Sequence, residues 1–271
     1  MRIGFVSDLH IDRNHKLKSA VYLDKTADFI ISRRLDMFVI GGDISNHYNK
    51  TLDFVEKLQQ ITKVPVYFIP GNHDFWSNKD SIDTWQIYEK YRKHPQSLLE
   101  SPIVINDEYA IVGHCAWYNY WIYDKKIDYK KVSSGTYRWA TWQDKKKINW
   151  GKSDPEVSKI FAHYIQEDLE KVKNYKIILV THMVTISEFT VPMPNRLFDF
   201  FNAYIATSDL LSFYKEYPIK YSFMGHVHFR GKIKKDNTIF ITNSLGYRRE
   251  WLSKDKNLEK ELEQSIYILK L

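Results

Sequence analysis

Cysteine is almost absent from this sequence of 271 residues, in which Cys115 is the only one. A single thiol excludes an intrachain disulfide, and such sparse use of cysteine is typical of proteins in a reducing compartment. No run approaches the roughly 18–20 apolar residues that cross a membrane, and no charged N-terminal segment precedes a long apolar stretch. We therefore expect no membrane span, no signal peptide and a cytoplasmic location.

Internal repeats and low-complexity tracts are also absent, and no change in composition marks a domain boundary. Hydrophobic residues make up 44% of the chain, which is enough to bury a sizeable core. We therefore expect a single domain over residues 1–271, with an insertion at about 117–152.

The segment 117–152 differs from the rest of the chain in both charge and aromatic content. The whole chain has a formal net charge of +7, which favours anionic partners. This segment alone holds nine Lys/Arg against three Asp, and five of the eight tryptophans. We interpret it as an insertion that covers or borders the functional site. Its rings and lysines would suit bases and phosphates, but packing of the rings under a solvated lysine face is the favoured interpretation.

Short apolar runs alternate with amphipathic helical patterns, which favours βαβ units and largely parallel pairing. The expected helices cover 16–34, 51–61, 81–93, 153–173 and 209–214. The expected strands cover 2–7, 35–40, 64–69, 102–106, 109–113, 177–180 and 221–224, followed by closing antiparallel strands at 229–234, 238–242 and 265–271.

Polar residues follow five of these strands, at the ends where ligands bind in α/β sheets. Asp43 follows two glycines that let the chain turn sharply after the strand at 35–40. Taken singly each motif is weak, but five in a row at strand ends indicate a common site. Their side chains are ligands that suit two divalent cations bridged by Asp43. The residues are Asp8, His10, Asp43, Asn72, His73, Asp74, His182, His226 and His228.

This set resembles the full signature of the calcineurin-like metallophosphoesterase superfamily, and it extends from Asp8 to His228. The resemblance implies an α/β (α+β) fold, a four-layer α/β/β/α sandwich of two mixed β-sheets flanked by helices. It also implies two divalent metal ions, Mn, Fe or Zn, bridged by Asp43. Asn46 stands where many relatives carry an acidic residue. One metal would be held by Asp8, His10 and His228, and the other by Asn72, His182 and His226.

Two such cations would polarise a phosphoryl group and acidify a bridging water, whose hydroxide attacks phosphorus in line. His73 would donate a hydrogen bond to the phosphate and act as general acid toward the leaving oxygen. Asp74 is expected to orient His73 and to raise its pKa, with a turn cap as the alternative. His114, Asn202 and Tyr204 are interpreted as packing residues.

These residues predict a metal-dependent hydrolase of phosphate esters, more specifically a phosphodiesterase. The basic, aromatic segment 117–152 suits a small phosphate ester such as a nucleotide, or a nucleic-acid fragment. A nuclease acting on polymeric nucleic acid is an alternative that would need an extended basic groove outside this segment. A catalytically silent metal-binding scaffold is another, although the intact ligand set and His73 argue against it.

Overall fold

The fold is built on two mixed β-sheets, seen in a computed structural model that describes residues 1–14, 16–76 and 83–271. The first sheet contains, in spatial order, β12 (Tyr267–Lys270), β1 (Arg2–Val6), β2 (Met37–Gly41) and β3 (Val66–Ile69). β1, β2 and β3 are parallel, and β12 runs antiparallel to β1 at one edge.

The second sheet contains, in spatial order, β10 (Arg230–Lys235), β11 (Thr238–Asn243), β9 (Ile219–Met224), β8 (Lys176–Thr181), β5 (Tyr109–His114) and β4 (Ile103–Val104). Its four central strands are parallel, and its two edge strands are antiparallel to their neighbours. Both sheets are therefore mixed, as the family resemblance implied.

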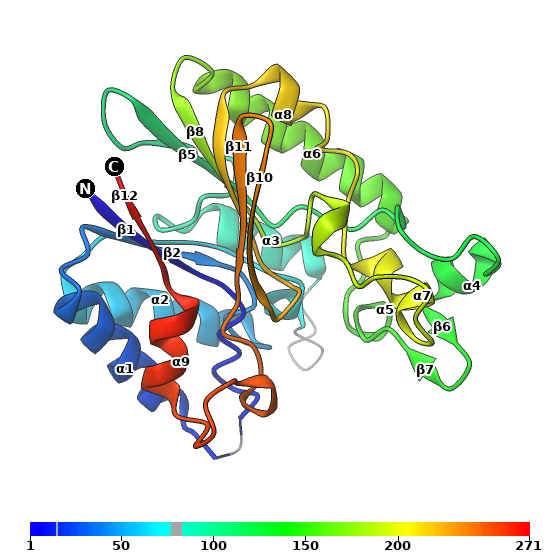
Figure 1. Cartoon of the computed structure of the whole chain (residues 1–271), viewed down its shortest axis with the longest axis horizontal. Helices are drawn as coiled ribbons and strands as arrows, with labels where there is room; N and C mark the ends of the chain where they lie inside the picture. Colours follow the sequence, from blue (N-terminus) through cyan, green and yellow to red (C-terminus); the bar gives the residue numbers. More distant parts are fainter. Residues whose placement is uncertain (15, 77–82) are drawn as a thin grey trace.

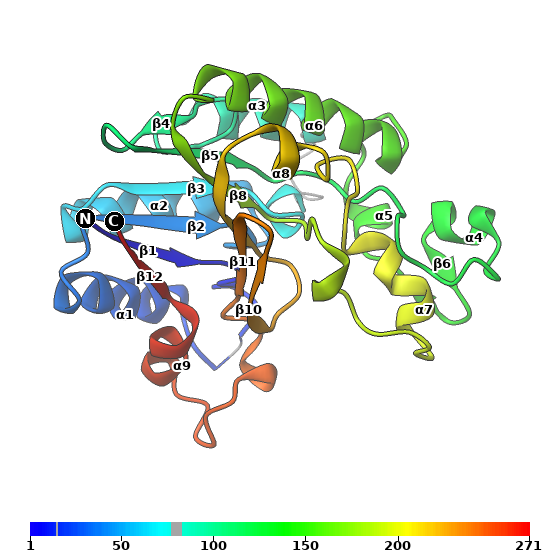
Figure 2. The same cartoon turned by 45° about the horizontal axis from the view of Figure 1, so that its top comes forward.

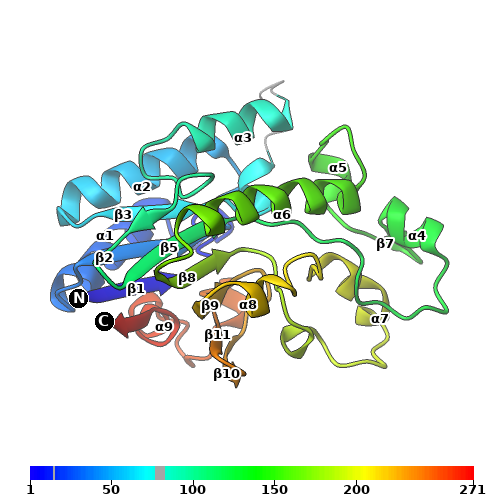
Figure 3. The same cartoon turned by 90° about the horizontal axis from the view of Figure 1, so that it is seen from above.

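Helices cover the outer faces of the two sheets (Figure 2). α1 (Ser19–Ser32) packs against α2 (Tyr48–Thr62) and α9 (Leu258–Ser265) beside the first sheet, while α3 (Thr84–Arg92) and α6 (Asp154–Lys171) lie on the other side, beside the second (Figures 2 and 3). This arrangement confirms the predicted four-layer sandwich. Within the described residues, no helix is both long and apolar enough to cross a bilayer.

Alternate side chains of the strands enter different cores. In β2, Met37 and Val39 face the second sheet, whereas Phe38 and Ile40 pack under the helices. Across the interface between the sheets, the ring of Phe5 stacks on that of Phe223 with their centroids 3.8 Å apart. Because both faces of β2 are buried, its sequence is a continuous apolar run rather than an alternating one.

Several C-terminal elements differ from the sequence expectations. The expected strand at 265–271 begins only at Tyr267, because α9 precedes it. Asn257 caps this helix. It has only two leucines, Leu258 and Leu262, both buried, so its sequence shows little helical periodicity. The run at 238–242 forms β11, which is parallel to β9 and antiparallel only to β10. The helix expected at 209–214 is instead α8 (Phe213–Glu216). The first two residues of the helix expected at 81–93 lie outside the described residues, and the rest contains α3.

The segment 117–152 projects to one side of the sandwich together with α7 (Phe198–Phe201) (Figure 1). Trp117 and Trp150 are buried in the main core, and the ring of Tyr137 stacks on Phe200 of α7, whereas Trp139 is 75% exposed. Most of its aromatic rings therefore pack internally, as the sequence favoured. The shorter elements of the chain are η1 (His73–Phe75), α4 (Tyr129–Ser134), β6 (Thr136–Tyr137), β7 (Ala140–Thr141), α5 (Asp144–Lys147), η2 (Ser187–Phe189), α7 (Phe198–Phe201), η3 (Asn202–Tyr204), α8 and η4 (Arg248–Glu250).

His114, the last residue of β5, is buried between α3 and α6. The backbone N–H of Ala116 donates to its Nδ1 atom at 3.1 Å, so the proton lies on Nε2, 3.0 Å from the Tyr88 hydroxyl. That hydroxyl in turn donates to Glu100. Burial lowers the pKa of His114 to about 3, so the folded protein holds a neutral imidazole and His114 has a packing role.

We predict that His114 makes the protein less stable in acid. The unfolded chain takes up this proton near pH 6.5 and the folded chain does not, so stability falls as the pH drops below 6.5. The loss between pH 8 and pH 5 should be about 2 kcal/mol, measurable by urea unfolding in the presence of a chelator. His114→Asn keeps an acceptor for Ala116 and does not titrate, so it should lose this part of the pH dependence. The same pH dependence in both proteins would contradict the assignment.

Candidate metal centre

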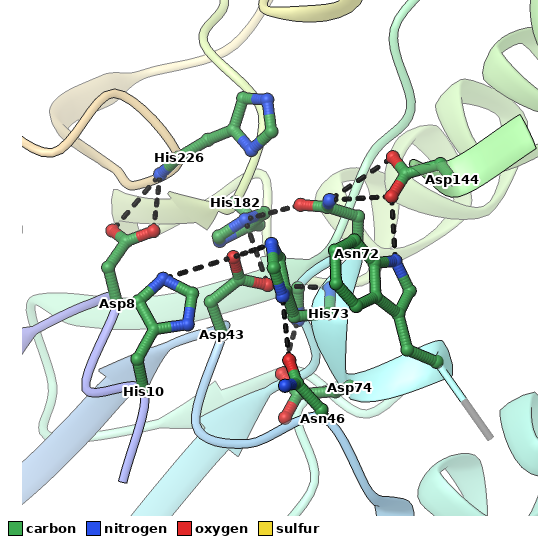
Figure 4. Close-up of polar contacts among 12 residues, drawn as sticks. Asp8, His10, Asp43, Asn46, Asn72, His73, Asp74, Asp144, His182 and His226 are labelled. Carbon is green, nitrogen blue, oxygen red and sulfur yellow. Dashed lines mark hydrogen bonds and ion pairs between the residues drawn. The ribbon is translucent and has the colours of Figure 1, made fainter. Parts of the chain in front are cut away.

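The predicted ligands converge beyond the carboxyl ends of five strands, which come from both sheets (Figure 4). The first sheet supplies the residues that follow β1, β2 and β3, and the second sheet supplies those that follow β8 and β9. In chain order these residues are Asp8, His10, Asp43, Asn72, His182, His226 and His228. All are buried except His226 and His228, which are partly exposed.

Five of these residues have left-handed backbone conformations, with φ angles of 56° for Asp8, 45° for His10, 54° for Asp43, 71° for His226 and 35° for His228. Side-chain-bearing residues rarely adopt this conformation, which costs on the order of 1–3 kcal/mol each and tends to cluster at functional sites. Hydrogen bonds between the loops maintain it: the N–H of His10 donates to the carbonyl of Asp43 at 3.0 Å, and that of His226 to the carboxylate of Asp8 at 3.1 Å.

Two glycines allow the loops after β2 and β3 to approach each other. Gly42 has a φ of 92°, and a Cβ atom there would lie 2.6 Å from Nδ1 of His182. A Cβ atom on Gly71 would lie 2.2 Å from Oδ1 of Asp43. Neither position has room for a side chain, because candidate ligands occupy the space.

The first group of candidate ligands is Asp8, His10, Asp43 and His228, whose ligand atoms lie within 4.8 Å of one another. Nε2 of His10 is 3.0 Å from Nε2 of His228 and 3.6 Å from Oδ2 of Asp43. Nδ1 of His228 lies 2.8 Å from the carboxylate of Glu250 and donates to it. The Nε2 atom of His228 is therefore turned toward the group.

The second group consists of Asp43, His182 and His226, with Asn72 beside them. Nε2 of His182 is 3.3 Å from Oδ1 of Asp43 and 3.1 Å from Oδ1 of Asn72. Nδ1 of His182 donates to the carbonyl of Gly41 at 2.9 Å, which leaves Nε2 available as a ligand. Nε2 of His226 donates in the same way to a backbone carbonyl, which leaves its Nδ1 available.

Asp43 belongs to both groups and offers a different oxygen to each, Oδ2 to His10 and Oδ1 to His182. Burial disfavours its charge, but the nearby histidines His182 and His73 hold the pKa of Asp43 well below its usual value. An ionised carboxylate in this position could contribute a ligand oxygen to each group.

The second group suits a cation. Two acceptor oxygens, Oδ1 of Asp43 and Oδ1 of Asn72, lie 3.3 and 3.1 Å from Nε2 of His182, which is favourable only when that nitrogen carries a proton or a cation lies among the three atoms. Burial acts against a charge on His182, yet Asp43 and Asp8 raise the pKa of His182 to about 9. At neutral pH His182 is therefore protonated, and a divalent cation would displace the proton from its Nε2 atom. The oxygen and imidazole ligands around that position are ones that such cations prefer. The donor set therefore fits divalent metal ions.

His73 is held by Asn46 and not by Asp74. Its Nδ1 lies 2.7 Å from Oδ1 of Asn46, its Nε2 is 3.9 Å from Oδ2 of Asp43, and its ring packs on Trp76 with centroids 3.7 Å apart. The side chains of His73 and Asn46 thus present Nε2 toward the candidate ligands (Figure 4). This contact was not predicted, and the only sign of it in the sequence is the position of Asn46 three residues after Asp43.

The contacts of Asp74 contradict the expected orienting role. Its buried carboxylate accepts hydrogen bonds from the N–H groups of Ser45 at 3.0 Å and Gly71 at 2.8 Å, and from the Thr51 hydroxyl at 2.6 Å. It therefore ties together the loops after β2 and β3, which corresponds to the turn-cap alternative. The expected rise in the pKa of His73 is also wrong, because burial lowers that pKa well below its usual value.

A cavity of about 530 Å³ opens beside both groups of candidate ligands. The polar part of its lining includes Asp43, Asn72 and His73. The guanidinium of Arg13, which also lines the cavity, lies 5.5 Å from the ring of Tyr247 and 6.0 Å from that of Trp76. The apolar wall of the cavity comes from three parts of the chain. It consists of Trp142 from the segment 117–152, Val191, Phe198, Phe201 and Ile205 after β8, and Val227 and Phe229 after β9.

Comparison with known proteins identifies the class to which this site belongs. The profile of the calcineurin-like phosphoesterase family matches residues 1–230, so the chain belongs to that family. The solved structure of phosphopantetheinyl hydrolase from Mycobacterium tuberculosis is similar in fold, with a TM-score of 0.73 and 17% identity over 92% of this chain and 90% of that one. A dimetal phosphatase from Danio rerio has a TM-score of 0.50, with 14% identity over 89% and 86% of the two chains.

Two relatives are similar in sequence. An uncharacterized protein of Acanthamoeba polyphaga mimivirus is 26% identical over 268 residues, which cover 92% of this chain and 93% of the relative. A protein of Fibrobacter succinogenes named "probable cyclic nucleotide phosphodiesterase" is 29% identical over 105 residues, or 34% of this chain and 40% of that protein. Family membership makes the protein a calcineurin-like phosphoesterase, and the structure gives it a candidate site for metal ions.

We predict that divalent metal stabilises the protein more strongly at higher pH. The proton on His182 must leave when a cation binds, so affinity should rise as the pH increases from 6 to 8. Adding Mn²⁺ to chelator-stripped protein should raise Tm, with about 2.7 kcal/mol of stabilisation at 100 times Kd. Asp43→Asn preserves the shape but removes the shared charge, and should lose most of the shift. An equal shift in Asp43→Asn would place the bound metal elsewhere.

We also predict that Asn46 supports turnover without contributing to metal binding. Asn46→Ala frees the ring of His73 and should lower kcat toward 2′,3′-cyclic nucleotides, whose ribose leaving oxygen needs a proton, by part of the ~10²–10⁴-fold that a general acid contributes. Asn46→Asp retains an acceptor for Nδ1 and should recover much of the loss. Metal content, measured by elemental analysis, should be unchanged in both variants. A variant that lost metal together with activity would contradict this role.

Proposed function

We propose that the protein hydrolyses phosphodiesters with two divalent cations, one held by each group of candidate ligands. The observation that carries the proposal is the position of Asp43, which is shared by both groups and lines the cavity. Bound there, the two cations would polarise the phosphoryl oxygens and provide an ionised water as nucleophile near neutral pH. The ligands are Asp8, His10, Asp43 and His228 for one cation, and Asp43, Asn72, His182 and His226 for the other.

The protein's own side chains then position and protonate the substrate. Nε2 of His73 faces the same space as Oδ2 of Asp43, so it lies over the phosphate. The negative charge of the bound substrate would raise the lowered pKa of His73, and the imidazolium then donates a proton to the leaving oxygen. Arg13 extends over the polar side of the cavity, where its charge favours an anionic substrate.

The shape of the cavity favours a diester with a planar, uncharged substituent. A diester carries groups on two sides of the phosphorus, and the cavity extends from the ligands to a wall that includes Trp142, Phe198, Phe201 and Phe229. Such a wall suits a nucleobase, because rings stack on aromatic side chains at about 1–3 kcal/mol per base. The likeness to a protein named as a cyclic nucleotide phosphodiesterase also supports this substrate class.

The first experiment compares two diesters with the same leaving group, p-nitrophenyl thymidine 5′-phosphate and methyl p-nitrophenyl phosphate, with Mn²⁺ added. The thymidine ester should have the higher kcat/KM, because only its base reaches the apolar wall. Phe229→Ala should raise KM for the thymidine ester alone, and Trp139→Ala, an exposed residue that does not line the cavity, should change neither value. Equal effects of Phe229→Ala on both esters would refute the substituent site, and no turnover would favour a silent metal-binding scaffold.

The second experiment tests His73 as the general acid. A ribose oxygen is a poor leaving group that needs a proton, whereas p-nitrophenolate leaves readily without one. His73→Gln should therefore reduce hydrolysis of 2′,3′- and 3′,5′-cyclic nucleotides by about 10²–10⁴-fold, and that of bis-p-nitrophenyl phosphate far less. Asn72→Ala should slow both kinds of substrate alike and lower metal content. Equal losses on both for His73→Gln would show that this residue only holds the phosphate.

A further inference from the structure

One carboxylate of the segment 117–152, that of Asp144, lies next to a candidate metal ligand. Asp144 is the first residue of α5, and its side chain is buried, with the residue only 2% exposed. It faces Asn72, whose Nδ2 lies 3.0 Å from Oδ1 and 3.1 Å from Oδ2 of Asp144 (Figure 4). The side chains that donate hydrogen bonds to its carboxylate are all neutral.

Two tryptophans show that both carboxylate oxygens of Asp144 accept hydrogen bonds. The indole N–H of Trp76 donates to Oδ1 at 2.7 Å, and that of Trp142 donates to Oδ2 at 2.9 Å. An indole can only donate, so both carboxylate oxygens act as acceptors. The Tyr118 hydroxyl adds a third donor to Oδ2 at 3.2 Å.

This arrangement fixes the orientation of the Asn72 amide. Its oxygen and nitrogen ends have nearly the same shape, so packing alone does not distinguish them. A carboxylate that only accepts must be met by the NH₂ end, and the oxygen must then point the opposite way. That oxygen, Oδ1, lies 3.1 Å from Nε2 of His182, on the side of the candidate metal ligands.

We propose that Asp144 is a positioning residue for metal binding, which holds Asn72 with its oxygen toward the cation and its NH₂ group away from it. The segment 117–152 thereby becomes part of the metal centre. Partners that orient a metal ligand typically contribute about 10–100-fold to metal affinity. The inference rests on the proposed role of Asn72 as a ligand.

Asp144 also connects this ligand to the cavity. Trp76, which donates to Oδ1, packs on the ring of His73, and Trp142, which donates to Oδ2, lines the apolar wall. A purely structural role for Asp144 would consist of holding these two indoles. The test therefore has to separate metal affinity from packing.

The decisive variant is Asp144→Asn, which keeps the shape but replaces one acceptor with a donor. Its single oxygen cannot accept from both indoles and from Asn72 at once, so it holds the NH₂ group of Asn72 less firmly and the amide is free to turn that group toward the metal. Titration of chelator-stripped protein with Mn²⁺, followed by the EPR signal of free Mn²⁺, should show about 10–100-fold weaker binding at one of the two sites. Tyr118→Phe is the matched control, because it removes a donor to Asp144 without touching Asn72, and it should leave metal affinity unchanged.

A double-mutant cycle separates this inference from the function on which it rests. In the Asn72→Ala background, Asp144→Asn should cause no further loss of Mn²⁺ affinity, because the side chain that it positions is absent. If Asp144→Asn weakened Mn²⁺ binding equally in the Asn72→Ala background, the positioning role would be overturned. It would also be overturned if Asp144→Asn in the wild-type background left Mn²⁺ affinity unchanged and only lowered Tm, as Tyr118→Phe does. Unchanged Mn²⁺ affinity in Asn72→Ala alone would instead refute Asn72 as a ligand.

Discussion

The shared carboxylate of Asp43 is the constraint on which the site depends. Its two oxygens face different groups of histidines, so the loops after β1, β2, β8 and β9 must all approach one buried side chain. The left-handed backbone at five candidate ligands and the two glycines without room for a Cβ atom are consequences of this convergence. The two packed sheets provide the rigid support that keeps such a strained arrangement in place.

The positions of most candidate ligands can be predicted from the sequence, because they depend on local patterns. Each candidate ligand directly follows an apolar strand, and parallel strands bring their carboxyl ends to one edge. Predicting β1, β2 and β3 was therefore enough to predict that Asp8, Asp43 and Asn72 lie near one another, and predicting β8 and β9 did the same for His182 and His226. The family resemblance supplied the second sheet, which local patterns did not indicate.

The residues that act on the ligands are harder to predict, because their contacts depend on tertiary structure. Asp74 is adjacent to His73 in the sequence, yet its side chain turns toward the N–H groups of two loops, and Asn46 contacts His73 instead. Asp144 precedes three lysines and looks like part of a solvated, charged run, yet it is 2% exposed. Neither periodicity nor motif distinguishes such residues from surface ones.

The division of the ligands between the two sheets has a mechanical consequence. Asp8, His10, Asp43 and Asn72 follow strands of the first sheet, whereas His182, His226 and His228 follow strands of the second. Each group of ligands draws on both sheets, so a cation bound by either one would cross-link the two halves of the sandwich. In a chain whose only cysteine is buried and unpaired, metal coordination would take the place of the covalent staple that a disulfide provides in other proteins.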